Sequence, residues 1–288
     1  MAALVDAPAV VPQLRPQQQI EGRMAHVVVF DSGTADETAT AVQYVEGEGY
    51  DEIRLGPESM PVVFNSVLLI PGLLNESECV SLIADVERCH DSFVAASSEG
   101  EQTAGQAVVQ PTHVTPGRAR YKIKDLSGES RGIFKRMLHS RLLPFLSTQS
   151  EIERHIWTQS LPASQPKGLL KDLTYYFSEN EPAINRYVSG GAFEPHADAH
   201  ACTVNILLAP AAFEGGGTHF WRESVGGSGP ELDGAGGLGP PTLCIHPAAA
   251  GTGMVWNGSV MHAGAATTEG TRHLLVASFT ISARHAFD

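Results

Sequence analysis

The hydrophobic pattern of the chain changes period near residue 173, with helical spacing before it and short strands after it. In the first part, apolar residues recur at helical spacing after Asn75, and Glu78 stands where a capping-box partner is expected. The stretch 127–146 (SGESRGIFKRMLHSRLLPFL) repeats that spacing and predicts a second helix that ends near Pro144. Two helices are therefore expected before the strand-rich part.

The second part contains seven strand-like runs separated by Gly and Pro turns. They are LTYYF, AINRYV, CTVNILL, THFWRE, TLCIH, GMVWN and RHLLVASFTI. Many short strands with frequent turns are typical of a β-sandwich or a jelly roll, and preceding helices would brace one sheet. Residues 25–31 and 62–70 also have strand character. We therefore predict a mainly β fold with supporting helices.

Several segments lack clear periodicity, and we predict their structure from composition. Residues 1–23 are rich in Pro, Gln and Ala and are expected to be disordered, and 33–48 to be a loop or a short helix. We expect a long surface loop at 95–118, a further helix at 151–160 and an inserted flexible loop at 226–241. The predicted organisation is an N-terminal extension, 1–55, partly disordered, and one domain, 56–288.

The acidic net charge of −13 makes nucleic acid a poor expected partner. The one basic segment, 118–124 (RARYKIK), is interpreted as a solvated face beside the second helix. The four cysteines form no CxxC pair, which disfavours a disulfide framework. The sequence shows no secretory signal and no apolar run long enough for a membrane span, so we expect a cytoplasmic protein without membrane contact.

A candidate metal site comes from His196, Asp198 and His262. In an extended segment the side chains of residues i and i+2 point to the same face, so His196 and Asp198 can reach one ion. His262 follows the GMVWN strand and a short turn. Two histidines and one carboxylate leave open positions on ferrous iron, as non-haem iron oxygenases require.

Arg272 begins the last predicted strand and adds a candidate anion site. Alternation places it on one face with Leu274 and Val276. An arginine among inward apolar neighbours is costly unless an anion pairs with it, and a carboxylate held in bidentate fashion meets that need. Arg272 is therefore a candidate carboxylate ligand; the alternative is an arginine whose head reaches solvent at the start of the strand.

Other conspicuous residues near this site have simpler explanations. We interpret four histidines as core or surface residues and two tryptophans as core: His200, His219, His246, His273, Trp221 and Trp256. The run 214–217 (EGGG) is expected to be a turn or a bulge, because no helix follows it to bind phosphate.

From residue 62 to 281 the sequence resembles the Fe(II)/2-oxoglutarate-dependent dioxygenases of the prolyl 4-hydroxylase-like group. The resemblance is strongest in NRYVSGGAFEPHADAH, TVNILL, FEGGGTHFW and HAGAATTEGTRHLLVASF, and the EGGG run and TTEGTRHLLVASF look most like the catalytic domain of lysyl hydroxylases. It implies a double-stranded β-helix (jelly roll) with His196, Asp198 and His262 as iron ligands. Arg272 would bind the distal carboxylate of 2-oxoglutarate.

The resemblance implies two further residues of the cosubstrate site. Tyr187 stands where the family often has a tyrosine beside 2-oxoglutarate, and Asn205 matches an asparagine of the lysyl hydroxylase pattern, facing the same way as Thr203 and Leu207. The alternatives are a core tyrosine whose hydroxyl is satisfied and an inner-face polar residue.

The implied cofactors are Fe(II), 2-oxoglutarate and O₂, with ascorbate as a reductant. The implied reaction is hydroxylation of a C–H bond, with a prolyl or lysyl side chain in a protein or peptide as the first expectation. A free amino acid or other small molecule is the alternative, and a non-catalytic jelly-roll binding module is the competing class. The chain departs from the family in the loop 225–241 and in CIHPAAAGTG, both near where substrates enter.

Overall fold

The computed structural model describes residues 18–20, 23–29, 40–44, 66–98, 108–148, 174–198, 200–222, 230, 232 and 236–282. The strands before residue 150 are β1 (Gln18–Ile20), β2 (Arg23–Val29), β3 (Thr40–Tyr44), β4 (Ser66–Ile70), β5 (His113–Thr115) and β6 (Arg118–Lys122). The helical elements are α1 (Glu76–Ser98), η2 (Ile123–Asp125), α2 (Gly128–Arg136), the π-helical η3 (Met137–Leu142), α3 (Leu143–Thr148) and η5 (Pro210–Ala212). The later strands are β7 (Thr174–Phe177), β8 (Ala183–Tyr187), β9 (Phe193–His196), β10 (Cys202–Leu207), β11 (Phe213–Gly215), β12 (Thr218–Phe220), β13 (Leu243–Pro247), β14 (Thr252–Asn257), β15 (His262–Gly264), β16 (Thr267–Gly270) and β17 (Arg272–Ser282).

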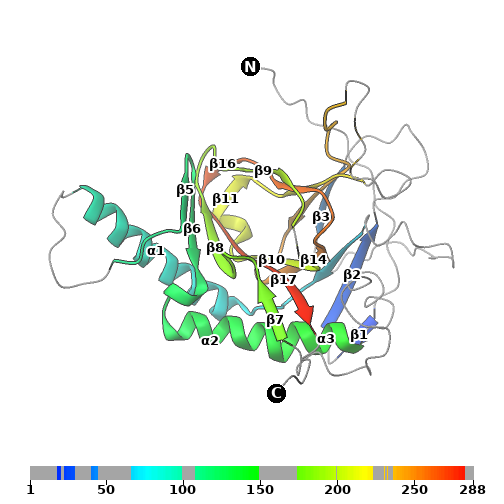
Figure 1. Cartoon of the computed structure of the whole chain (residues 1–288), viewed down its shortest axis with the longest axis horizontal. Helices are drawn as coiled ribbons and strands as arrows, with labels where there is room; N and C mark the ends of the chain where they lie inside the picture. Colours follow the sequence, from blue (N-terminus) through cyan, green and yellow to red (C-terminus); the bar gives the residue numbers. More distant parts are fainter. Residues whose placement is uncertain are drawn as a thin grey trace.

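Eight of the later strands form two facing sheets (Figure 1). The first sheet contains β8, β17, β10 and β14 side by side in that order, and the second contains β9, β15, β12 and β13. The chain crosses between the sheets after β8, β9, β10, β13, β14 and β15. This alternation is that of a jelly roll, so the predicted double-stranded β-helix is confirmed. All seven predicted runs from residue 173 onward contain a strand.

Strands from outside the jelly roll lengthen both sheets. β4, β2 and β1 continue the first sheet beyond β14, β6 and β5 continue it beyond β8, and β7 pairs with the end of β17. β3 pairs in parallel with β13, which corrects the expectation of a loop or short helix at 33–48. Within the described part of the chain, β9 is the edge strand of the second sheet and pairs with β15 alone.

Some sequence predictions lie wholly or largely outside the described residues. These are most of the disorder expected at 1–23, the helix expected at 151–160 and most of the loop at 226–241. Within 1–23, residues 18–20 form β1 and Arg23 begins β2, so the expected disorder is wrong at these positions. Within the loop at 226–241 the structure describes an isolated bridge between Leu232 and Leu238. In the described part of the chain, no helix is long and apolar enough to cross a membrane.

The start of α1 follows the predicted capping box. The Asn75 side-chain oxygen accepts from the Glu78 amide at 2.9 Å, and the Glu78 carboxylate accepts from the Asn75 amide at 3.1 Å. The helix continues to Ser98, and β5 and β6 follow before residue 123. The long loop predicted at 95–118 is therefore wrong at both ends.

The second predicted helix does not end near Pro144. α2 passes through η3 into α3, and Pro144 is the second residue of α3. The amide of Leu143 donates to the carbonyl of Leu138, five residues earlier, which is the bonding pattern of a π-helix. Because this turn changes the hydrogen-bond register just before Pro144, the helix accommodates a residue that lacks an amide hydrogen.

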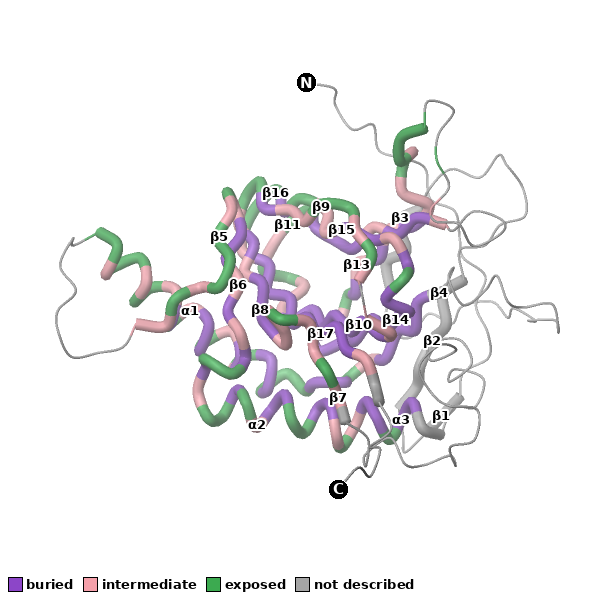
Figure 2. Tube along the Cα trace, in the orientation of Figure 1, coloured by how far each residue is buried: buried purple, intermediate pink, exposed green. Residues whose placement is uncertain are grey.

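The helices cover the outer face of the first sheet (Figures 1 and 2). Leu82 and Val86 of α1 and Leu138 of η3 share one buried cluster with Val204 and Leu275, which point outward from β10 and β17. Each such side chain contributes on the order of 2 kcal/mol when it leaves water. The inner face of this sheet therefore lines the space between the two sheets.

A charged cluster ties α1 to the first sheet. Glu87 accepts hydrogen bonds from Arg186 at 2.8 Å and from His273, which neighbour each other across β8 and β17. Burial alone raises the pKa of Glu87, but these hydrogen bonds and charges outweigh it and lower the pKa to about 2. The carboxylate is thus more strongly stabilised in the folded protein than in the unfolded chain.

We expect this cluster to make folding stability sensitive to acid. Because the folded pKa of Glu87 is depressed, its contribution is complete above the unfolded value near 4.5 and is lost as pH falls towards about 2. Glu87→Gln should lose about 1–2 kcal/mol at pH 7. Urea unfolding at pH 7 and pH 3 checks this, because the gap between wild type and variant should narrow at pH 3. Asp91→Asn, an exposed change on the same helix, is the control, and an equal gap at both pH values would contradict the assignment.

Candidate functional site

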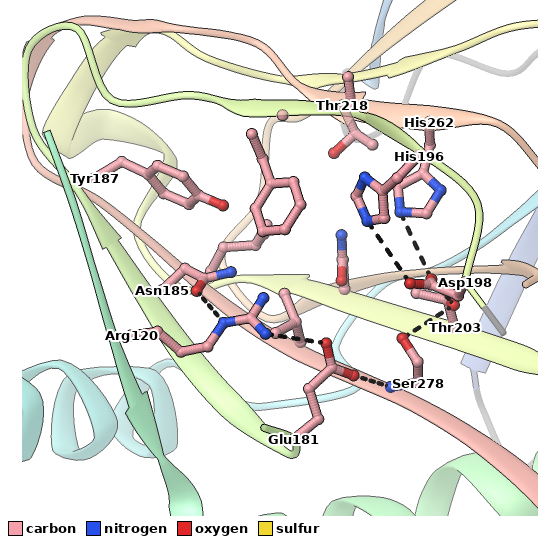
Figure 3. Close-up of a pocket in the computed structure, with 16 residues that line it drawn as sticks. Arg120, Glu181, Asn185, Tyr187, His196, Asp198, Thr203, Thr218, His262 and Ser278 are labelled. Atoms are coloured by element: carbon pink, nitrogen blue, oxygen red, sulfur yellow. Dashed lines mark hydrogen bonds and ion pairs between the residues drawn. The ribbon is translucent and has the colours of Figure 1, made fainter. Parts of the chain in front are cut away.

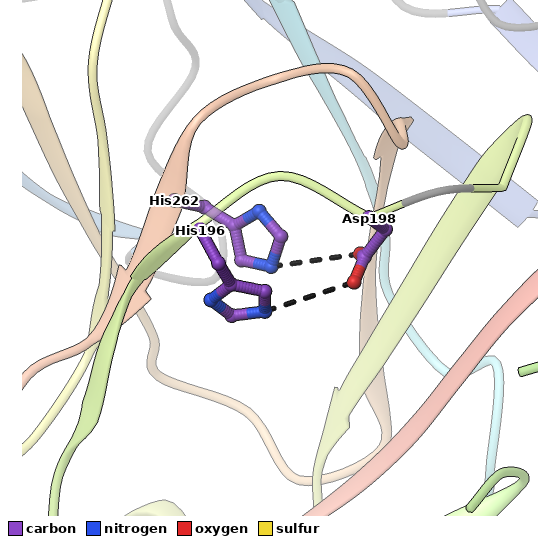
Figure 4. A group of neighbouring side chains, drawn as sticks. All are labelled: His196, Asp198 and His262. Carbon is purple, nitrogen blue, oxygen red and sulfur yellow. Dashed lines mark ion pairs between the residues drawn. The ribbon is translucent and has the colours of Figure 1, made fainter. Parts of the chain in front are cut away.

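Three separate parts of the jelly roll bring His196, Asp198 and His262 together (Figure 4). His196 ends β9, Asp198 follows two residues later, and His262 begins β15. β9 and β15 pair antiparallel with His196 directly opposite His262, so the pairing of the two strands places both rings side by side. Within the described residues this is the one group of three or more histidine, cysteine or acidic residues arranged to hold a metal ion.

The ligand atoms of this triad all lie within 4.8 Å of one another. The Nε2 atoms of His196 and His262 each lie 3.6 Å from a carboxylate oxygen of Asp198. Such separations fit an ion bound about 2.1 Å from each ligand atom. The Nδ1 atoms lie 2.8 Å from the Glu194 carbonyl and 2.9 Å from the Val260 carbonyl. Since a carbonyl only accepts, each Nδ1 carries the proton and each Nε2 has a lone pair for the metal.

His262 is held in a buried, neutral state. Its ring is in a T-shaped contact with Trp256 at 4.9 Å between centroids. Burial is the main cause that lowers the pKa of His262 to about 4, while the nearby Asp198 opposes it. At neutral pH the Nε2 atom of this ring is therefore unprotonated, and it does not have to release a proton before it binds a cation.

Asp198 is oriented by the strand that follows it. The Thr203 hydroxyl of β10 donates to the Asp198 carboxylate and also lies 3.2 Å from the Ser278 hydroxyl. The Asp198 amide donates to the Gly258 carbonyl at 2.7 Å. Backbone and side chain of Asp198 are thus both fixed before any ion binds.

Thr203→Val should weaken metal binding about 10- to 100-fold, because it removes the hydroxyl that orients Asp198 and keeps the side-chain volume. Titration with Co(II), followed by its visible absorption, measures the change. Thr252→Val is the matched control, because the buried Thr252 hydroxyl has no partner among the described residues and lies outside the triad. Equal metal affinity in the Thr203→Val variant would remove Thr203 from this role.

A cavity between the two sheets joins the triad to polar residues of the first sheet (Figure 3). Tyr187 and Asn205 both line it, as does Thr203, so Asn205 faces inward as predicted. The Thr218 hydroxyl also lines it and is buried without a hydrogen-bond partner among the described residues. The sequence predicts a strand at Thr218 but no role in the site, although alternation along THF marks its side chain as inward-facing.

Arg272 lies opposite Tyr187 in the ladder between β17 and β8. Its side chain is 1% exposed, and its Nε and Nη1 atoms have no hydrogen-bond partner among the described residues. Burial lowers the pKa of its guanidinium. Arg272 borders a neighbouring cavity of about 460 Å³, and its guanidinium carbon is 5.4 Å from the centre of the Tyr187 ring, which lines the triad cavity. A buried cation with unused donors is the arrangement a carboxylate would complete.

The interpretation of residues 118–124 as a solvated face is wrong. Residues 118–122 form β6, which pairs with β8 in the first sheet, and residues 123–124 belong to η2. Ala119 and Tyr121 point to the helix-covered core, whereas Arg118 is buried and Arg120 lines the triad cavity. The alternation of charged and apolar residues in RARYKI was the signal that predicts such a strand.

The structure also places the other conspicuous residues near the site. His200, His219, His246 and His273 are outside the metal-binding group. Trp256 is fully buried, and Trp221 is 7% exposed. The EGGG run contains a register shift between Glu214 and Gly215 in the pairing of β11 with β16, as expected for a bulge. The four cysteines are free thiols.

Comparison with known proteins finds distant structural likenesses only. No protein-family model and no curated protein matches the sequence. The chain is similar to HygX from Streptomyces hygroscopicus, solved with nickel and 2-oxoglutarate, at 14% identity and a TM-score of 0.42 over 81% of this chain and 89% of the other. It is similar to a 2OG-Fe(II) oxygenase family oxidoreductase from Burkholderia pseudomallei at 18% identity and a TM-score of 0.39 over 59% and 72%. It is also similar to a Pseudomonas putida prolyl-4-hydroxylase at 14% identity and a TM-score of 0.35 over 72% and 88%. Likenesses this low carry no functional argument, so the candidate function depends on the site itself.

Proposed function

We propose that the chain is an Fe(II)- and 2-oxoglutarate-dependent oxygenase that hydroxylates a C–H bond. The observation that carries this is the pairing of two features in one jelly roll. The ligand atoms of His196, Asp198 and His262 lie within 4.8 Å of one another, and Arg272 is buried with two nitrogens that lack partners among the described residues. A non-catalytic binding module would need neither an open face on the metal nor a costly buried arginine.

Each of these residues has a separate role in the proposed reaction. His196, Asp198 and His262 hold the iron, and Arg272 binds the distal carboxylate of 2-oxoglutarate. Tyr187 and Asn205 line the triad cavity, and Tyr187 pairs with Arg272 across the strand ladder, so both would orient the cosubstrate. When bound, iron with 2-oxoglutarate and O₂ supplies the oxidising chemistry that converts the cosubstrate to succinate, and ascorbate serves as a reductant.

The substrate is proposed to be a prolyl or lysyl side chain of a protein or peptide, as in the hydroxylases that the sequence resembles. A free amino acid or other small molecule is the second candidate substrate. The charged side chains that line the triad cavity could bind the charged groups of such a molecule. We also propose that 56–288 form the catalytic domain and that 1–55 are an extension to it. The free thiols fit a reducing, cytoplasmic location.

The test combines binding and turnover on the full chain. Anaerobic addition of Fe(II) and 2-oxoglutarate should produce a visible metal-to-ligand charge-transfer band. Admission of O₂ should then give succinate. A chain that binds Fe(II) but shows neither the band nor succinate would support the non-catalytic alternative.

A further inference from the structure

The triad cavity carries positive charge that neither the metal site nor Arg272 explains. Arg120 of β6 lines this cavity, and its side chain is 13% exposed. Arg118, two residues earlier on the same face, is 9% exposed, and its Nε has no partner among the described residues. Two guanidinium groups in a protein of net charge −13 thus face the interior of the jelly roll.

Phe193 places both arginines close to the metal site. The guanidinium carbons of Arg118 and Arg120 lie 4.1 and 5.6 Å from the centre of the Phe193 ring. The same ring lies 4.5 Å from the ring of the ligand His196, centre to centre. A small molecule bound to Arg120 could therefore extend as far as the candidate metal site.

Glu181 offsets this charge only in part. Its carboxylate lies 3.5 Å from Arg120 Nη1, longer than the usual 2.7–2.9 Å of a charge-assisted hydrogen bond. Its other oxygen already accepts from the Ser278 amide. Burial is the main cause that raises the pKa of Glu181. The ionised carboxylate is therefore not fully stabilised by the arginine.

Arg120 retains donors for a ligand. Its Nε donates to the Asn185 side-chain oxygen at 2.8 Å, which fixes the plane of the guanidinium. A guanidinium has five N–H donors, and an oriented one binds a carboxylate through two of them. The Arg120 guanidinium is therefore oriented by Asn185 and still has N–H donors available for a ligand (Figure 3).

We propose that Arg120, with added charge from Arg118, binds a carboxylate of the primary substrate. This inference rests on the proposed oxygenase function and narrows its substrate class to acids and zwitterions. A singly charged carboxylate fits better than a phosphate dianion, because Glu181 and Asp198 border the same cavity and would repel a second charge. The carboxylate can belong to a free amino acid or to an acidic residue of a peptide.

A binding experiment tests the site without knowledge of the natural substrate. The full chain is loaded with Co(II) and saturating 2-oxoglutarate, and benzoate is titrated while its proton NMR lines are observed. Binding beside the metal should broaden them, and benzamide should broaden far less. Arg120→Gln should weaken benzoate binding at least about tenfold, and Arg120→Lys should recover part of it. Lys124→Gln, which removes an exposed charge after the same strand, should bind benzoate as the wild type does.

A turnover experiment identifies the source of the carboxylate. Succinate formation is compared for L-proline and L-lysine against their carboxamides, and for N-acetylated prolyl and lysyl peptides with a neighbouring Glu against the same peptides with Gln. Stimulation by the free acids alone assigns a free amino acid, and stimulation by the Glu peptides assigns an acidic peptide.

Specific results would overturn the proposal. Equal broadening of benzoate and benzamide, or unchanged benzoate affinity in Arg120→Gln, removes the carboxylate site. So does an Arg120→Gln variant whose main defect is a raised 2-oxoglutarate requirement, because Arg120 would then bind the cosubstrate. A wild-type chain that gives no Co(II) spectrum and no succinate instead contradicts the oxygenase function, so the two failures are distinguishable.

Discussion

Asp198→Ala should reduce iron-dependent succinate formation at least about 100-fold. Asp198 is the one carboxylate in the triad, and its two oxygens lie 3.6 Å from the Nε2 atoms of His196 and His262. Without it the two neutral histidines must hold a dication alone, and the remaining coordination positions are no longer fixed. The measurement is succinate produced per bound iron, with iron content determined separately.

The matched control for this loss is His200→Gln, two residues after Asp198. His200 contacts the Thr280 hydroxyl at 3.2 Å and is outside the metal-binding group. This variant tests whether any change in this segment disrupts the protein. Asp198→Ala protein that is folded, contains iron and forms succinate at the wild-type rate would disprove the ligand assignment.

Arg272→Met should abolish the use of 2-oxoglutarate and at the same time stabilise the protein without ligands. The Arg272 side chain is buried, and two of its nitrogens lack partners among the described residues, so its charge opposes folding until an anion arrives. Methionine fills similar space without charge, and we expect a gain of about 1–2 kcal/mol in the free energy of unfolding. Thermal unfolding with and without 2-oxoglutarate and Fe(II) measures both effects.

Arg141→Met provides the opposite case in the same protein. The Arg141 guanidinium binds the Glu78 carboxylate through two nitrogens, at 2.8 Å from Nη2 and at a second contact from Nη1. Its loss leaves the buried Glu78 carboxylate with the Asn75 amide and the more distant Arg136, at 3.8 Å, and should cost about 2 kcal/mol. If Arg272→Met also destabilises the protein without ligands, Arg272 is a structural residue and the cosubstrate assignment is wrong.

The sequence predicted the strands and the inward pair of His196 and Asp198 because both follow local rules. Alternation identified the later strands, and the spacing of His196 and Asp198 placed both side chains on one face. The helix through Pro144 and the inward position of Arg118 and Arg120 depend on non-local packing. Helices cover the apolar side of β6, and that contact decides which way its arginines point.

The register between paired strands places residues together in the site that are far apart in the sequence. Arg118, Tyr187 and Arg272 come from three distant segments, yet they lie in one row across β6, β8 and β17. No spacing rule connects residues 118 and 272, because the row exists only after the sheet forms. The Thr218 hydroxyl is likewise buried and has no hydrogen-bond partner in the part of the chain that the structure describes, which no sequence pattern predicts.

The edge position of β9 makes the local dynamics of this strand a measure of metal loading. Among the strands that the structure describes, β9 pairs with β15 alone, and that pairing is irregular beyond His262. An ion shared by His196, Asp198 and His262 would fasten this edge to its neighbour and to the start of β10. Amide hydrogen exchange in β9 should therefore slow when metal binds, even in variants that no longer turn over. The strand would report occupancy of the site independently of catalysis.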